Sequence, residues 1–220
     1  MKVTFVTKGG ITDFMSNGSK EDFSSDAVIF GFNGMGVVSY KKELDGKDGK
    51  LADLARLSKE LGCVAISGCD TDTFGVFRRS VAVADRGRLL GVSDCLSEPE
   101  ECEFRCGVGS NVYNTSKGKI GIIVDKDVYD MSLFKKTSCE EVDAVFCVIK
   151  NVKNHLPEVM LRAGSVYGGL SSAICSGGFY SVSDANGEII RSGSSPYGRC
   201  EIPVNRSYVV MTCKKRSAVF

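Results

Sequence analysis

Residues 50–67, KLADLARLSKELGCVAIS, contain two hydrophobic patterns in direct succession. In the first, the apolar side chains keep mainly to one face of a helix, and they are Leu51, Leu54, Ala55, Leu57 and Leu61. Gly62 is suited to end that helix in a left-handed conformation, and the apolar run Cys63–Ser67 that follows is typical of a strand. Asp26–Phe30 is an earlier run of the same kind. The order strand, helix, strand predicts an α/β fold with helices layered on a sheet.

Strands and hairpins account for most of the remaining pattern. Two hairpins are indicated by the turns Asp85-Arg-Gly87 and Asp184-Ala-Asn-Gly187. The continuous apolar run Ala144–Ile149 is typical of a strand buried on both faces. Further strands are expected over residues 2–7, 77–85, 88–90, 119–125, 170–175 and 200–204, and helices over 131–136 and 155–167. We therefore expect large mixed sheets covered by helices in a single domain, residues 1–220, with a C-terminal strand and tail from about residue 205.

The charge balance argues against several classes of partner. The 220 residues include 28 Lys and Arg against 27 Asp and Glu, so the formal net charge is +1. This leaves no basic field for nucleic acid and no polybasic patch for a membrane surface. No secretory signal opens the sequence, and no apolar run approaches the ~20 residues that span a bilayer. We expect a cytoplasmic protein with neither nucleic-acid nor membrane partners.

Ten cysteines and one histidine bear on metal and redox chemistry. Structural zinc sites use several His ligands or closely spaced Cys pairs. Five residues separate Cys63 from Cys69 and three separate Cys102 from Cys106, and the single histidine is His155. Several cysteines lie inside apolar strand patterns, where they act as small hydrophobic residues. We expect free thiols, no metal site and no cofactor.

Taken in order, these signals resemble the nitrilase, or carbon–nitrogen hydrolase, superfamily. In that family an Asp precedes an apolar strand ending in Pro-Glu, and the matching place is Asp26-Ala-Val-Ile-Phe-Gly-Phe32. In the family, a turn similar to Asp85-Arg-Gly-Arg-Leu-Leu-Gly91 is followed by a catalytic lysine. The family's nucleophile lies in a segment whose frame is matched by Gly118–Asp127. Arg162-Ala163 and the hairpin turn at 184–187 resemble two later signals. The resemblance implies an α-β-β-α sandwich of two mixed sheets covered by helices.

The resemblance also implies where the catalytic groups of the family would stand. That family hydrolyses nitriles or amides with Glu as general base, Lys as stabiliser of the oxyanion and Cys as nucleophile. The matching positions here hold Phe32, Cys95 and Asp125, two residues before a retained Asp127. A further family glutamate, in the pattern Glu-x-x-x-Phe-x-x-Gly, is matched by Glu100. A Phe cannot transfer a proton, and a carboxylate is a far poorer nucleophile toward an amide than a thiolate.

Two functional hypotheses follow from these substitutions. In the first, the chain is a nitrilase-like scaffold without the usual amidase or nitrilase activity, and it binds a small amide-like or carboxylate ligand or a protein partner. In the second, it is an active amide hydrolase with a site rebuilt around Cys95, Glu100 and Asp125, which predicts a thiol of low pKa.

The resemblance further implies a homodimer. Such pairing would use a helix-covered face and the C-terminal strands, for which the apolar segment Tyr208–Met211 is a candidate. A third reading sets the family aside and treats the chain as an unrelated α/β domain. A structure without two face-packed mixed sheets would favour that reading.

Overall fold

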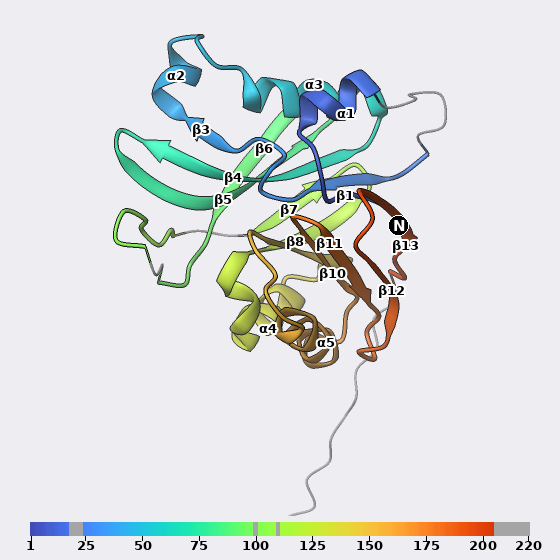
Figure 1. The fold of residues 1–220 in the computed structure, drawn as a ribbon. Coiled ribbons are helices and arrows are strands. Elements are labelled where there is room, and N and C mark those ends of the chain that lie inside the picture. The colour runs from blue at the N-terminus through green and yellow to red at the C-terminus, as the bar shows by residue number, and fades with distance from the viewer. Residues whose placement is uncertain (18–23, 99–100, 109–110, 205–220) are drawn as a thin grey trace, which may run out of the picture.

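A computed structural model describes residues 1–17, 24–98, 101–108 and 111–204 of the chain. Two β-sheets pack face to face, and helices cover the outer face of each sheet (Figure 1). The layers therefore follow the order helix, sheet, sheet, helix, as the resemblance predicts. Within the described residues, no helix combines the length and apolar character that a membrane crossing needs.

The first sheet is mixed and holds both ends of the described chain. Its strand order is β13-β1-β2-β4-β5-β6, with β3 paired to β4. The pairs β1·β2, β2·β4 and β3·β4 are parallel, whereas β13·β1, β4·β5 and β5·β6 are antiparallel. The strands are β1 (Lys2–Val6), β2 (Ala27–Phe30), β3 (Val37–Ser39), β4 (Val64–Thr73), β5 (Val76–Asp85), β6 (Arg88–Asp94) and β13 (Tyr197–Glu201).

The second sheet is mixed as well, with parallel strands at its centre. Its order is β12-β11-β10-β9-β8-β7, in which β8, β9 and β10 run parallel and the outer pairs are antiparallel. The strands are β7 (Val112–Thr115), β8 (Gly118–Val124), β9 (Ala144–Ile149), β10 (Ser172–Ser176), β11 (Phe179–Ser183) and β12 (Ile189–Gly193).

The helices are α1 (Ile11–Asn17), α2 (Tyr40–Leu44), α3 (Lys50–Leu61), α4 (Met131–Cys139) and α5 (Leu156–Gly168), with a 3₁₀ helix, η2 (Asp125–Tyr129). The amphipathic pattern of α3 has its expected effect, since Leu54 and Leu57 are buried against the first sheet. Gly62 ends α3 with φ at +61°, as predicted for a left-handed cap. On the other outer face, Gly164 of α5 allows Phe134 of α4 to pack closely, because a Cβ there would lie 2.6 Å from that ring.

Among the described residues, three apolar cores hold the layers together. The central core lies between the two sheets, where Phe5 stacks on Tyr180 with ring centroids 5.0 Å apart. The other two lie between each sheet and its helices. Cys63, Cys147 and Cys175 are buried in these cores, as their apolar surroundings predict. Burial raises the pKa of the Cys63 and Cys175 thiols to about 12, so both stay protonated at neutral pH.

The structure corrects several predicted boundaries. The strand expected over 63–67 continues to Thr73, because residues 68–73 pair with β5 although their sequence is polar and glycine-containing. The final strand is Tyr197–Glu201 rather than 200–204, since the antiparallel register against β1 ends at Glu201. The strand predicted over 119–125 ends one residue earlier than expected, at Val124. The segments α1, α2, β3 and β7 were not predicted, and Tyr208–Met211 lies outside the described residues.

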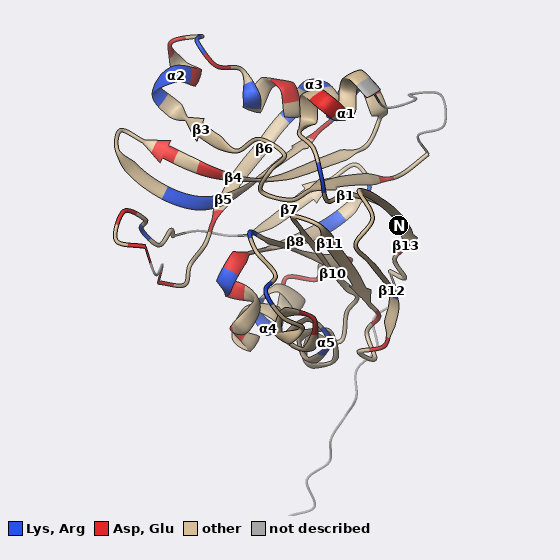
Figure 2. Cartoon of the chain, in the orientation of Figure 1, with Lys and Arg blue, Asp and Glu red and all other residues tan. Residues whose placement is uncertain are grey.

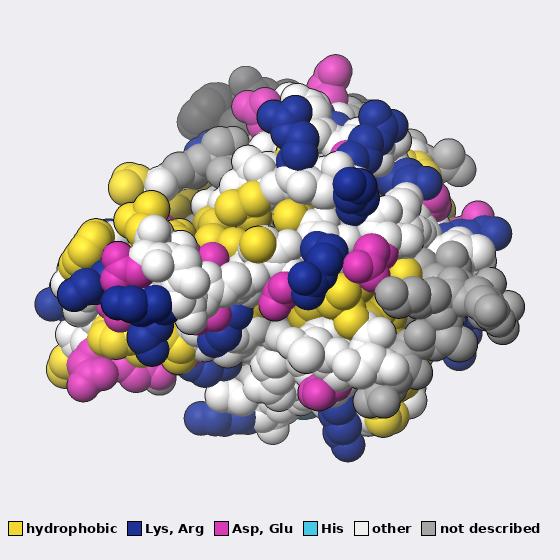
Figure 3. All heavy atoms as spheres, turned by 90° about the horizontal axis from the view of Figure 1, so that it is seen from above, with side chains coloured by type: hydrophobic (Ala, Val, Ile, Leu, Met, Phe, Trp, Pro, Cys, Tyr) yellow, Lys and Arg dark blue, Asp and Glu magenta, His cyan; other side chains and the backbone are white. Residues whose placement is uncertain are grey.

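Charged side chains of both signs share the outer surface. Figure 3 shows Lys and Arg interspersed with Asp and Glu on the face covered by α1 and α3. Figure 2 shows positive charge on β5 and negative charge on the neighbouring β4. Arg79 of β5 and Asp70 of β4 each form an ion pair with a residue of the other sheet or its adjoining loop.

Candidate functional site

Asp125 stands where β8 ends and η2 begins. Its φ of +49° lies in the left-handed region, which costs a non-glycine residue of order 1–3 kcal/mol and is found mainly where neighbouring structure enforces it. The side chain is 7% exposed. Oδ1 accepts the backbone N–H of Lys150 at 3.0 Å, and Oδ2 accepts Nη1 of Arg79 at 2.6 Å. Both carboxylate oxygens of Asp125 are therefore engaged.

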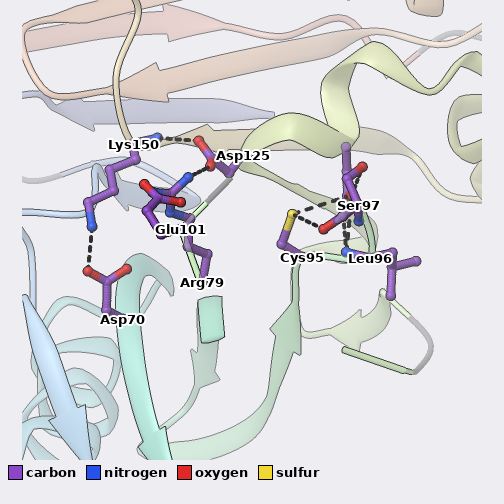
Figure 4. A network of polar contacts seen from close by, with 9 residues as sticks. Asp70, Arg79, Cys95, Leu96, Ser97, Glu101, Asp125 and Lys150 are labelled. Carbon is purple, nitrogen blue, oxygen red and sulfur yellow. Dashed lines mark hydrogen bonds and ion pairs between the residues drawn. The ribbon is translucent and has the colours of Figure 1, made fainter. Parts of the chain in front are cut away.

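Arg79 projects from β5 into the space between the sheets (Figure 4). Its guanidinium binds Asp125 through Nη1 and Glu101 through Nη2. The guanidinium carbon also lies 5.3 Å from the centre of the Phe104 ring, within the range of a cation–π contact. Burial alone would lower the pKa of Arg79, but the charges of Asp125 and Glu101 outweigh it and raise the pKa above its ordinary value. Arg79 is a permanent cation in this site.

Cys95 follows β6 and lies against a second buried aspartate. Its backbone N–H donates to the carbonyl of Arg79 at 2.8 Å, and its Sγ donates to Oδ1 of Asp127 at 3.5 Å. Burial, with the negative charge of Asp127, raises the pKa of the Cys95 thiol to about 12. At neutral pH the Cys95 thiol therefore stays protonated, whereas the thiolate is the nucleophilic form of cysteine.

Asp127 fixes the segment that follows β6. Its fully buried carboxylate accepts the backbone N–H groups of Leu96, at 2.9 Å, and Ser97, at 2.7 Å. The hydroxyl of Ser97 donates to the same carboxylate at 2.7 Å. These donors are neutral, so Asp127 is held by hydrogen bonds rather than by an ion pair.

Phe32 lies in the central core beyond the end of β2 and is 5% exposed. Its ring rests on Gly68 of β4, where an added Cβ would come within 2.8 Å of the ring. Phe32 is thus an apolar core residue packed against a close glycine.

The structure brings two of the predicted site residues to one cavity. Cys95 and Asp125 line it, together with Arg79, Ser97, Phe104, Arg105 and Lys126. Its volume is about 10 Å³, about the space that one water molecule needs. Phe32 shares the central core with Cys95 but is not among the described residues that line this cavity. Glu100 lies outside the described residues, and its neighbour Glu101 contacts Arg79 beside Asp125.

A second ion pair links the two sheets beside this cavity. Nζ of Lys150, after β9, lies 2.5 Å from Oδ2 of Asp70 on β4. The same ammonium is 5.6 Å from the centre of the Phe104 ring, so Phe104 has a cation near it from each sheet. Elsewhere in the described ranges, as here, no three His, Cys, Asp or Glu side chains are grouped as metal ligands.

Sequence reasoning missed Arg79 and Lys150. For Arg79 a signal existed, because strand alternation places it on the same face as Val81 and Val83, which belong to the central core. A charge at an inward position of an apolar strand indicates a buried partner. Lys150 follows its strand and carries no such pattern.

Comparison with known proteins gives different results for sequence and for structure. No family model matches the sequence, and no curated protein matches it. Nit3 of Saccharomyces cerevisiae, a member of branch 10 of the nitrilase superfamily, matches the structure with a TM-score of 0.77 and 15% identity, over 92% of this chain and 90% of that one. The chain has the nitrilase fold.

Two further solved structures agree with the nitrilase fold. The amidase NitN from Nesterenkonia sp. AN1 matches with a TM-score of 0.77 and 14% identity, over 92% of this chain and 93% of that one. A carbon–nitrogen hydrolase from Helicobacter pylori G27 matches with a TM-score of 0.72 and 15% identity, over 90% and 88%. Variants of the Nesterenkonia amidase carry the acetamide moiety of fluoroacetamide on the active site cysteine. At these identities the likeness establishes the fold, which confirms the predicted α-β-β-α sandwich.

Proposed function

We propose that this nitrilase-fold chain does not hydrolyse amides or nitriles by the usual route and acts as a binding scaffold for a small molecule or a protein partner. The observation that carries the proposal is the state of Asp125, whose two carboxylate oxygens are bound by Arg79 at 2.6 Å and by the Lys150 N–H at 3.0 Å. A carboxylate held in this way is a weak nucleophile. The guanidinium of Arg79 also lines the small cavity beside this carboxylate.

The dimensions of the site support the same conclusion. Attack on an amide carbon requires the reacting atoms to approach within about 3–3.5 Å in the correct orientation. The cavity between Cys95 and Asp125 has a volume of about 10 Å³, which is too small for even acetamide. Phe32, at the position of the general base, has no proton to transfer.

The alternative of a hydrolase rebuilt around Cys95, Glu100 and Asp125 requires a reactive thiol at Cys95. Burial and the charge of Asp127 raise the pKa of that thiol to about 12, which works against the alternative. Iodoacetamide at neutral pH separates the two proposals. We expect exposed Cys102 and Cys106 to be alkylated far faster than Cys95, whereas faster alkylation of Cys95 would favour the rebuilt hydrolase.

Fluoroacetamide tests the scaffold proposal directly, because it labels the active site cysteine of a protein with this fold. After prolonged incubation, intact mass and peptide mapping should reveal no adduct at Cys95 or Asp125. The matched controls are Cys95→Ser and Asp125→Asn, which should give the same peptide map as the wild type. A wild-type adduct that disappears in either variant would contradict the proposal.

We further infer that the protein forms a homodimer through α5. The helix buries Leu161, yet the apolar residues on its outer side are exposed, and they are Leu156, Val159, Ala163, Val166 and Tyr167. The first four recur at the three- and four-residue intervals of a helix–helix seam. A second copy of the chain would present the same stripe and cover this one.

Sedimentation velocity tests the dimer. Val159→Glu places a charge in the stripe and should convert a dimer to a monomer, because a buried unpaired charge is costly. Leu44→Glu is the matched control, since Leu44 is 80% exposed and belongs to α2. The inference fails if the wild type is monomeric or if both variants behave alike.

A further inference from the structure

Arg79 binds two carboxylates that differ sharply in exposure. Asp125, on Nη1, is 7% exposed, whereas Glu101, on Nη2, is 47% exposed. Asp125 is buried and held by hydrogen bonds from Arg79 and from the backbone of Lys150. Glu101 reaches Arg79 from the surface, on the segment that joins the two sheets after β6 (Figure 4). The guanidinium therefore has one buried edge and one edge that faces outward.

The outward edge has the features of a carboxylate site. A guanidinium presents parallel N–H donors that match the two oxygens of a carboxylate. The Phe104 ring lies beside it and supplies an apolar wall, with Arg79 at 5.3 Å and Lys150 at 5.6 Å from the ring centre. Nε of Arg79 is buried, so Nη2, which Glu101 contacts, is the donor on the outward edge. An incoming carboxylate would therefore take the place of Glu101 on Nη2.

The segment that carries Glu101 is anchored to the first sheet and to Cys95 through Arg105 and Gly107. The Arg105 N–H donates to the carbonyl of Phe77 at 2.9 Å, and the Gly107 N–H donates to the carbonyl of Cys95 at 2.8 Å. These bonds fix the wall formed by Phe104. The contact of Glu101 with Arg79 is an exposed ion pair, a kind that contributes little to stability and exchanges readily.

We propose that the outward edge of Arg79 binds a small monocarboxylate and that Glu101 is its built-in occupant, displaced when the ligand arrives. This rests on the proposed function as a binding scaffold and assigns the ligand class. A monocarboxylate replaces the carboxylate of Glu101 without changing the charge of the site. A phosphate dianion would add negative charge beside Asp125 and Asp70, and a neutral amide offers no charge to Arg79.

Binding of acetate tests the proposal, with acetamide as the neutral ligand of the same shape. When an internal occupant holds the binding-competent state to a minor population, the apparent Kd rises in inverse proportion to that population. Glu101→Ala should therefore bind acetate more tightly than the wild type, by up to about sixfold for an occupant held by less than about 1 kcal/mol. Glu103→Ala is the matched control, because Glu103 is exposed on the same segment and is not among the described contacts of Arg79. The control should bind acetate like the wild type.

Arg79→Lys in the Glu101→Ala background should lose the gain, because an ammonium lacks the paired donors of a guanidinium. Thermal unfolding of each variant shows that it is folded. The proposal is overturned if Glu101→Ala and Glu103→Ala bind acetate equally, if the gain persists with Arg79→Lys, or if acetamide or inorganic phosphate binds as tightly as acetate.

Ammonia release from acetamide, measured on the same samples, separates this inference from the proposed function. Hydrolysis by the wild type would overturn the proposed function whatever the acetate titration shows. Unchanged acetate affinity in Glu101→Ala, without hydrolysis, would overturn only the carboxylate site.

Discussion

Asp125 and Asp127 lie two residues apart in η2, yet the protein holds them in opposite ways. Asp125 adopts a left-handed backbone conformation and forms an ion pair with Arg79. Arg79 forms a second ion pair with Glu101 at the surface. Asp127 is fully buried and accepts only neutral donors from the segment after β6. The same residue type thus supports two structures, a charged network open to solvent at one end and a closed hydrogen-bonded clamp. We infer that only the first retains a capacity to bind.

The largest effect is expected from Asp127→Ala. The substitution leaves the partly buried N–H groups of Leu96 and Ser97 without their acceptor, and each such loss costs about 1–3 kcal/mol. Urea denaturation should show a loss of about 3 to 5 kcal/mol in the free energy of unfolding. Asp127→Asn keeps one acceptor oxygen and should lose less. A loss under about 1 kcal/mol for Asp127→Ala would show that the clamp is not structural.

Asp125→Asn should have an intermediate effect. It removes the charge opposite Arg79 but keeps an acceptor for the Lys150 N–H, and Glu101 still contacts the guanidinium. We expect a loss of about 2 kcal/mol, smaller than the cost of isolating a buried cation completely. The same urea titration measures it. If Asp125→Asn costs as much as Asp127→Ala, the two aspartates do not differ in the way described.

The smallest effect is expected from Glu101→Gln. Partial burial would raise the pKa of Glu101, but its own backbone N–H and the Arg79 charge outweigh this and hold the pKa below its ordinary value of 4.5. A lowered folded pKa adds stability above the unfolded pKa and loses it as the pH falls through the folded value. Between about pH 6 and about pH 3, the wild type should therefore lose slightly more stability than Glu101→Gln, by less than about 1 kcal/mol. Identical pH profiles would show that the pair contributes nothing.

The sequence predicted the layers of this fold better than it predicted the site. The helix over Lys50–Leu61, its glycine cap and the buried strand Ala144–Ile149 follow from local periodicity, which requires no knowledge of distant residues. The polar half of β4 and the short strand β3 depend on pairing with each other and with β5, so their own sequence carries little signal.

The site depends on how the two sheets are placed against each other. Arg79 and Asp125 are 46 residues apart, with Arg79 on β5 of the first sheet and Asp125 directly after β8 of the second, so no local pattern specifies their contact. Alternation along β5 could have placed Arg79 between the sheets, but not opposite Asp125. The resemblance predicted that Cys95 and Asp125 lie in one pocket, and in the structure both line the same cavity.

We propose that the pairing of Asp125 with Arg79 leaves this nitrilase-fold chain without amide hydrolysis. The most direct test is ammonia release from acetamide by the wild type, followed over a day at high protein concentration beside Asp125→Asn. The account predicts the same background rate for both proteins. Release by the wild type that is abolished in Asp125→Asn would contradict it.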